Sequence, residues 1–88
     1  MPAVLYVLKS AEKPRRYIGI TRDLNQRLRS HRKKESKGGQ LLGRFAVVHT
    51  EEFPDYVSAR GREIFLKSGQ GRKWLDENLP KVEPARGG

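Results

Sequence analysis

Two strand-like segments separated by a short break constrain the fold more than any other feature. Residues 3–9 (Ala-Val-Leu-Tyr-Val-Leu-Lys) and 17–20 (Tyr-Ile-Gly-Ile) are rich in β-branched, aromatic and aliphatic side chains, which is typical of buried strands. Between them, residues 13–16 (Lys-Pro-Arg-Arg) form a turn-like basic break. Strands this close along a chain most simply form a hairpin. We therefore expect Tyr6 and Tyr17 on neighbouring strands, in a register that the sequence leaves open.

The first helix is expected over residues 24–35, with Thr21 and Asp23 both suitable as N-cap. Four of its side chains recur at three- and four-residue spacing and form one stripe: Leu24, Arg27, Leu28 and His31. The leucines must be buried for the helix to pack. Arg27 and His31 are therefore carried toward the sheet or to the rim of a cleft beside it.

The second half of the chain predicts one strand and two helices. Residues 44–50 have the composition of a third strand, and a second helix is expected from Asp55, its N-cap, to Ser68, with Gly69 as its stop. The apolar stripe of this helix contains Tyr56, Ala59, Glu63 and Leu66. Glu63 thus lies within that stripe and not opposite it. A last short helix over residues 71–79 is anchored by Trp74, Leu75 and Leu79.

Gly61 lies inside the second helix, where glycine costs about 1 kcal/mol relative to alanine. Close packing or the close approach of a ligand would explain it. The predicted order is β-β-α-β-α-α, an α/β fold with a small central three-stranded antiparallel sheet flanked by helices. At 88 residues we expect one domain over residues 1–80, followed by a flexible tail over residues 81–88.

The net charge is the strongest indication of a partner. Nineteen Lys and Arg against ten Asp and Glu give a formal charge of +9, which favours nucleic acid over a membrane surface or a merely basic exterior. The apolar stretch Ala3–Leu8 is too short for a membrane span or a signal peptide. Without cysteine there is no disulfide and no thiolate metal site. No membrane association and a cytoplasmic location are expected.

Phosphodiester cleavage needs parts that this chain carries in order. A hard cation needs an anionic oxygen ligand, an activated water needs a base, and the charge that builds on the phosphate needs a fixed cation. Glu63 could be the ligand of the cation, Tyr17 or His31 the base, and Arg27 the fixed positive charge. Taken singly each has a simpler explanation, such as an ordinary helix ion pair between Glu63 and Lys67.

The ordered motifs resemble those of the GIY-YIG nucleases. Val4-Leu5-Tyr6 is followed after ten residues by Tyr17-Ile18-Gly19, then by a helix with Arg27 and His31, and later by a helix with Glu63. The resemblance spans roughly residues 3–79 and marks a small, single-domain, stand-alone member. Val4-Leu5 replaces the Gly-Ile of the first motif, which keeps the strand and its tyrosine.

The resemblance implies a metal-dependent DNA endonuclease. Tyr6 and Tyr17 would flank the attacked phosphate, with Tyr17 taking the proton of the water or orienting it. Arg27 would bind the scissile phosphate, and His31 would assist proton transfer. Glu63 would hold a single Mg²⁺ or Mn²⁺. The products would carry a 5′-phosphate and a 3′-hydroxyl. Gly19 and, loosely, Asn78 are supporting candidates, although Gly19 could simply end its strand.

Further basic residues are expected to track phosphates along the nucleic acid: Arg15, Arg16, Arg29, Arg32, Lys33, Lys37, Lys67, Arg72 and Lys73. Phosphate contacts position a protein without supplying sequence choice, and no base-reading element is visible. The expected substrate is therefore structured or damaged DNA, with DNA repair among the open roles, or specificity comes from a protein partner. The alternative is a catalytically inactive or RNA-directed nucleic-acid-binding module of the same fold.

Overall fold

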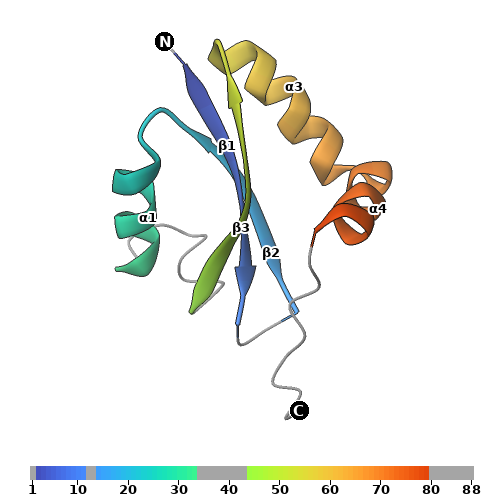
Figure 1. Ribbon diagram of the computed structural model, residues 1–88, viewed down its shortest axis with the longest axis horizontal. Helices are drawn as coiled ribbons and strands as arrows, with labels where there is room; N and C mark the ends of the chain where they lie inside the picture. Colours follow the sequence, from blue (N-terminus) through green and yellow to red (C-terminus); the bar gives the residue numbers. More distant parts are fainter. Residues whose placement is uncertain (1, 12–13, 34–43, 80–88) are drawn as a thin grey trace.

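The order of elements matches the predicted β-β-α-β-α-α series. A computed structural model describes residues 2–11, 14–33 and 44–79 (Figure 1). The elements are β1 (Ala3–Ser10), β2 (Arg16–Thr21), α1 (Leu24–Arg32), β3 (Phe45–Phe53), α3 (Tyr56–Lys67) and α4 (Gly69–Asn78). The predicted end of the first helix at residues 34–35 and the predicted tail over residues 81–88 lie outside the described residues.

The three strands form one antiparallel sheet in the order β2-β1-β3, so that β1 is central and β2 is an edge strand. The hairpin register places Tyr6 opposite Gly19 and Leu8 opposite Tyr17. Directly paired residues of antiparallel strands share a face of the sheet. Tyr6 and Tyr17 therefore lie on the same face, diagonally across the first two strands.

Helices cover both faces of the sheet, with α1 on one side and α3 and α4 on the other (Figure 1). On the α1 side, Tyr6 and Leu8 pack with Leu28. Their neighbours in β1 point the opposite way, and Leu5 and Val7 pack with the side chains that α3 and α4 contribute: Leu66 and Leu75. Since both faces are covered, β1 is apolar along most of its length without the polar alternation of a half-exposed strand.

The helices begin at N-cap residues whose side-chain oxygens, carboxylate for aspartate and hydroxyl for serine, accept hydrogen bonds from helix amides. Asp23 is the N-cap of α1, and its Oδ1 accepts from the Gln26 amide at 3.1 Å. Asp55 is the N-cap of α3, and its Oδ1 accepts from the Ser58 amide at 2.7 Å. These bonds satisfy amides that have no partner inside the helix. Of the two N-cap candidates for α1, Asp23 is therefore the cap, while the Thr21 hydroxyl accepts from the Asp23 amide at 3.1 Å.

The junction between α3 and α4 differs from the prediction. Gly69 does not stop α3; it is the first residue of α4. Ser68 is at once the C-cap of α3 and the N-cap of α4, and its hydroxyl accepts from the Gly71 amide at 3.2 Å. A serine in an extended conformation can end one helix and begin the next without a left-handed glycine. The two helices are thus joined through a single residue.

Three further expectations are corrected. Tyr56 is 44% exposed, because only the later residues of the expected stripe reach the sheet. Gly61 has no packing role, since a Cβ added there would meet nothing within 4 Å. The third strand runs on to Phe53 because that residue pairs with Ala3 at the start of β1. Across the described residues, no helix is long and apolar enough to span a membrane.

Candidate active site

Three rings gather on the α1 side of the sheet. Tyr6, from β1, and His31, from α1, are almost completely buried, and the Tyr6 hydroxyl lies 3.1 Å from His31 Nε2. The Tyr17 ring, from β2, has its centroid 6.1 Å from that of Tyr6 and 5.0 Å from that of His31. Tyr17 is only partly buried. The structure therefore brings together three of the predicted catalytic residues, and Tyr17 is the one among them with access to solvent.

Gly19 makes room for this cluster. It lies within β2 opposite Tyr6, two residues before the strand ends, so it does not serve as the end of the strand. A Cβ at this position would lie 2.5 Å from the Tyr6 hydroxyl oxygen and 3.0 Å from Cε1 of Tyr17. Real Cβ atoms do not come that close to other heavy atoms. Glycine is thus required by the packing of the two tyrosines.

Burial keeps both buried rings of the cluster uncharged near neutral pH. It raises the pKa of Tyr6 far above the ordinary value of 10.0, and the nearby Tyr17 raises it further. Burial also lowers the pKa of His31 below its ordinary 6.5, and the positive charge of Arg27 lowers it further. Tyr6 therefore keeps its proton and is unsuited to act as a base. A neutral imidazole can accept a proton, so His31 retains that capacity.

Arg27 and Glu63 act on this cluster from two different helices. Arg27 is exposed on α1, one turn before His31. Glu63 belongs to α3, which covers the other face of the sheet, and is 6% exposed. The charge of Arg27 lowers the pKa of Tyr6 and that of Glu63 raises it. Both charges are therefore close enough to be felt at the ring cluster.

Both carboxylate oxygens of Glu63 are held by basic side chains of its own helix. Arg60 Nη1 donates to Oε1 at 2.6 Å, and Lys67 Nζ lies 3.2 Å from Oε2. The Lys67 pair was the simple explanation expected for this glutamate from its spacing. The Arg60 pair was missed, although its three-residue spacing is an equally visible helical neighbour.

Comparison with known proteins decides the family. A model of the GIY-YIG catalytic domain matches residues 2–75, most of the chain. The chain belongs to the GIY-YIG family. It is also similar to the UPF0213 protein BH0048 from Bacillus halodurans, solved by solution NMR, with 26% sequence identity and a TM-score of 0.54. That likeness covers 88% of this chain and 84% of the other. No curated protein matches.

Membership of the GIY-YIG family gives the chain a nuclease-type fold and places the ring cluster, Arg27 and Glu63 inside the matched region. Asn78 lies beyond it. Its side-chain amide donates to the Trp74 carbonyl, one turn earlier in α4, at 2.8 Å. This bond gives Asn78 a role within its own helix, and support of the active site stays a prediction.

The donors present fit a cation that is held mainly by its substrate. Among the described residues, no group of three or more His, Asp or Glu side chains could form a metal cage. Glu63 is a single, nearly buried carboxylate. Mg²⁺ is commonly bound through one or two carboxylates, waters and the phosphates of a substrate, without a dedicated protein cage. A single carboxylate matches that mode, and both oxygens of Glu63 are paired with Arg60 and Lys67 in this structure.

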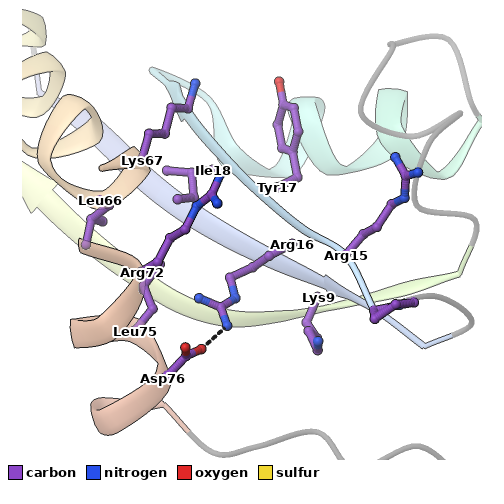
Figure 2. A pocket seen from close by; sticks show the side chains of 11 residues that line it. Lys9, Arg15, Arg16, Tyr17, Ile18, Leu66, Lys67, Arg72, Leu75 and Asp76 are labelled. Carbon is purple, nitrogen blue, oxygen red and sulfur yellow. Dashed lines mark hydrogen bonds and ion pairs between the residues drawn. The ribbon is translucent and has the colours of Figure 1, made fainter. Parts of the chain in front are cut away.

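The predicted phosphate-tracking residues separate into two groups. Four of them line a groove of about 580 Å³ that also borders Tyr17 (Figure 2): Arg15, Arg16, Lys67 and Arg72. Lys9 lines the same groove and was missed, because its place beside α4 depends on the packing of three elements. Four others are exposed elsewhere, on α1 and α4 or just after α1: Arg29, Arg32, Lys33 and Lys73. Lys37 lies outside the described residues.

Proposed function

We propose that this GIY-YIG domain is a metal-dependent DNA endonuclease that hydrolyses phosphodiester bonds with one Mg²⁺ or Mn²⁺. The observation that carries the proposal is the contact of Tyr6, Tyr17 and His31 on the α1 side of the sheet. Arg27, exposed one helical turn before His31 on α1, and Glu63, nearly buried on α3, add one cationic and one anionic side chain. A base, a phosphate-binding cation and an anionic metal ligand are the parts that hydrolysis of a phosphodiester requires.

Each side chain has a role that follows from its exposure and protonation state. Tyr17, partly exposed, holds and orients the attacking water. As Tyr17 takes the proton that the water releases, its own hydroxyl proton passes to His31, which is neutral and fully buried beside it. Tyr6 keeps its proton, and its hydrogen bond to Nε2 fixes the His31 ring. Burial and the charge of Arg27 lower the pKa of His31, so the ring is uncharged in the resting state.

Arg27 and Glu63 handle charge on the phosphate. The exposed guanidinium of Arg27 is free to reach a substrate above the ring cluster, and its planar donors suit two phosphate oxygens at once. A divalent ion bound at Glu63 supplies stabilisation of the leaving oxygen when present. Glu63 would hold that ion, and in the resting domain Arg60 and Lys67 pair with this nearly buried carboxylate. The resting domain is thus spared an unpaired buried charge.

A plasmid-nicking assay tests the proposal. Supercoiled DNA is incubated with Mg²⁺ or Mn²⁺ and with wild type, Glu63→Gln or Arg27→Ala. Matched controls are Glu52→Gln and Arg22→Ala, which change the same residue types at exposed positions outside the site. We expect nicking to fall at least about 100-fold in both site variants, as for loss of a transition-state contact, and to persist in both controls.

Three other outcomes would reject the proposal. Nicking that survives in Glu63→Gln and Arg27→Ala would show that the cleavage arises elsewhere, and the site would have to be abandoned. DNA binding that survives in Glu63→Gln, with no metal-dependent product from any protein, would favour the non-cutting binding module of the same fold. Tighter binding of structured RNA than of DNA would favour the RNA-directed form of that alternative.

A further inference from the structure

The groove beside Tyr17 lies along the edge strand β2 and is closed on its other side by the end of α3 and by α4 (Figure 2). Five basic side chains line it: Lys9, Arg15, Arg16, Lys67 and Arg72. Among the described residues that line it, Asp76 is the only acidic one. The groove is therefore strongly positive on a molecule that is already basic.

Within the described part of the chain, two of these five cations have an ion-pair partner. Asp76 accepts a hydrogen bond from Arg16 across the groove, and Lys67 pairs with Glu63. For Lys9, Arg15 and Arg72, the described part of the chain offers no ion pair. Like charges that line one hollow without counterions repel one another, and a bound polyanion relieves that repulsion. The three cations are thus available to contact phosphates.

The floor of the groove differs from its rim. Ile18, Leu66 and Leu75 line the hollow together with the cations, and all three belong to the hydrophobic core. These three side chains are at most 9% exposed, so a ligand in the groove would instead reach the partly exposed ring of Tyr17 on its border. A single strand of nucleic acid suits cations beside an exposed ring, because its unpaired bases stack on aromatic side chains while its phosphates contact the cations.

The size of the groove argues against a duplex. A volume of about 580 Å³ lies within the roughly 300–1,000 Å³ of pockets that hold one small ligand. This is the size class of individual nucleotides and not of a double helix. Tyr17 also borders the groove, so a strand lying in it would lead directly to the ring cluster.

We propose that the groove binds a single-stranded DNA segment adjacent to the bond that is cut. DNA with an unpaired arm is then preferred over continuous duplex. The position of the cut rests on the proposed nuclease function, whereas the binding itself does not. Lys9, Arg15 and Arg72 contact the phosphates of the arm, and the Arg16–Asp76 pair joins the two sides of the groove on which they lie.

Fluorescence anisotropy without divalent metal tests the binding. Three labelled DNAs are compared: a single strand, a blunt duplex, and the same duplex with a single-stranded arm. Arg72→Gln is measured against Arg22→Gln, which removes the same charge from an exposed position outside the groove. Circular dichroism confirms that both variants are folded.

We expect wild type to bind the armed duplex and the single strand more tightly than the blunt duplex. Arg72→Gln should lose about tenfold in affinity for the two DNAs with unpaired strands, as for a lost charged hydrogen bond. The slope of log affinity against log salt should fall by about 0.7 with the single strand. The affinity of Arg72→Gln for blunt duplex, and all affinities of Arg22→Gln, should change by less than about threefold.

Equal losses of affinity for all three DNAs, or equal losses of affinity in the two variants, would overturn the proposal. Either result would show that the DNA is bound by the basic surface in general and not by the groove. A wild-type preference for blunt duplex would overturn it as well. Because the measurement needs no cleavage, failure of the nicking assay would remove the nuclease function without touching this result. If the expected binding differences are not found but metal-dependent nicking is, only the proposed role of the groove is rejected.

Discussion

Substituting Gly19 by alanine tests the packing of the ring cluster at a single atom. The added Cβ would lie 2.5 Å from the Tyr6 hydroxyl oxygen, 2.7 Å from its Cζ and 3.0 Å from Cε1 of Tyr17. Tyr6 is 1% exposed, and its hydroxyl is tied to His31, so it has no open space into which to move. The substitution must therefore displace Tyr6, Tyr17 or the strand itself.

The size of the effect follows from three contributions. Overpacking a filled core costs about 1–3 kcal/mol, and breaking the Tyr6–His31 hydrogen bond adds about 1 kcal/mol. Alanine restricts the unfolded chain more than glycine does, which returns roughly 0.4–1 kcal/mol. We expect the free energy of unfolding to fall by about 1–3 kcal/mol. The domain should stay folded, and nicking should fall because both tyrosines shift.

Urea denaturation followed by circular dichroism measures the change, with Gly61→Ala as the matched control. A Cβ at position 61 meets nothing within 4 Å, so alanine there should stabilise the domain by about 0.5–1 kcal/mol through helix propensity. The two variants make the same chemical change with opposite expected signs. An unchanged or raised stability of Gly19→Ala would refute the reasoning, and so would a destabilised Gly61→Ala.

Three further predictions concern other parts of the fold. Gly71→Ala should destabilise the domain by about 3 kcal/mol or more, seen as a lower urea midpoint, because its Cβ would lie 2.0 Å from the Phe65 carbonyl oxygen. The pKa of His31 is lower in the folded than in the unfolded chain, so its contribution to stability is complete above pH 6.5 and is lost as the pH falls from 6.5 through the folded pKa. His31→Gln should therefore make the free energy of unfolding less dependent on pH in that window, as measured by denaturation at a series of pH values. Glu51→Gln should cost about 1–2 kcal/mol in the same denaturation assay, because Glu51 holds Arg62 over the Trp74 ring at 4.6 Å.

Glu51 titrates in a different window from His31, so the two contributions can be separated. Burial raises the pKa of Glu51, but the hydrogen bonds of Arg62 and His49 outweigh it and bring the pKa below 4.5. Its contribution is present above pH 4.5 and is lost as the pH falls through the folded value. A loss of stability in Glu51→Gln that persists unchanged at strongly acid pH would contradict this assignment.

Local patterns were sufficient for the elements and for part of the site. The apolar runs predicted β1 and β2, and the stripe on α1 correctly carried His31 inward, although a histidine in that position alone is more often exposed. The predicted burial of Tyr56 was wrong, because helical spacing defines which face of a helix is buried but not where along the helix the contact with the sheet begins. The last residues of β3 were not predicted, because Glu51 and Glu52 interrupt the apolar composition of the strand. Charged side chains are tolerated there because β3 is an edge strand.

Relations between distant residues were out of reach. The opposition of Tyr6 and Gly19 depends on the hairpin register, which the spacing of the two strands does not determine. Lys9 could not be assigned to the groove, because β1, β2 and α4 meet there only after folding. The ion pair of Arg60 with Glu63 was visible as a spacing, but nothing in the spacing indicated that the carboxylate would pair with both Arg60 and Lys67.

The single-residue joint at Ser68 bears on how such a domain can change during evolution. α3 carries Glu63, α4 carries Arg72, and Gly71 packs directly against the last turn of α3. With no linker to absorb an insertion or a change of angle, any reorientation of α4 would be transmitted to the carboxylate. With the proposed function, side-chain exchanges along the groove would change substrate preference, whereas remodelling the backbone at this joint would displace Glu63 and Arg72 together.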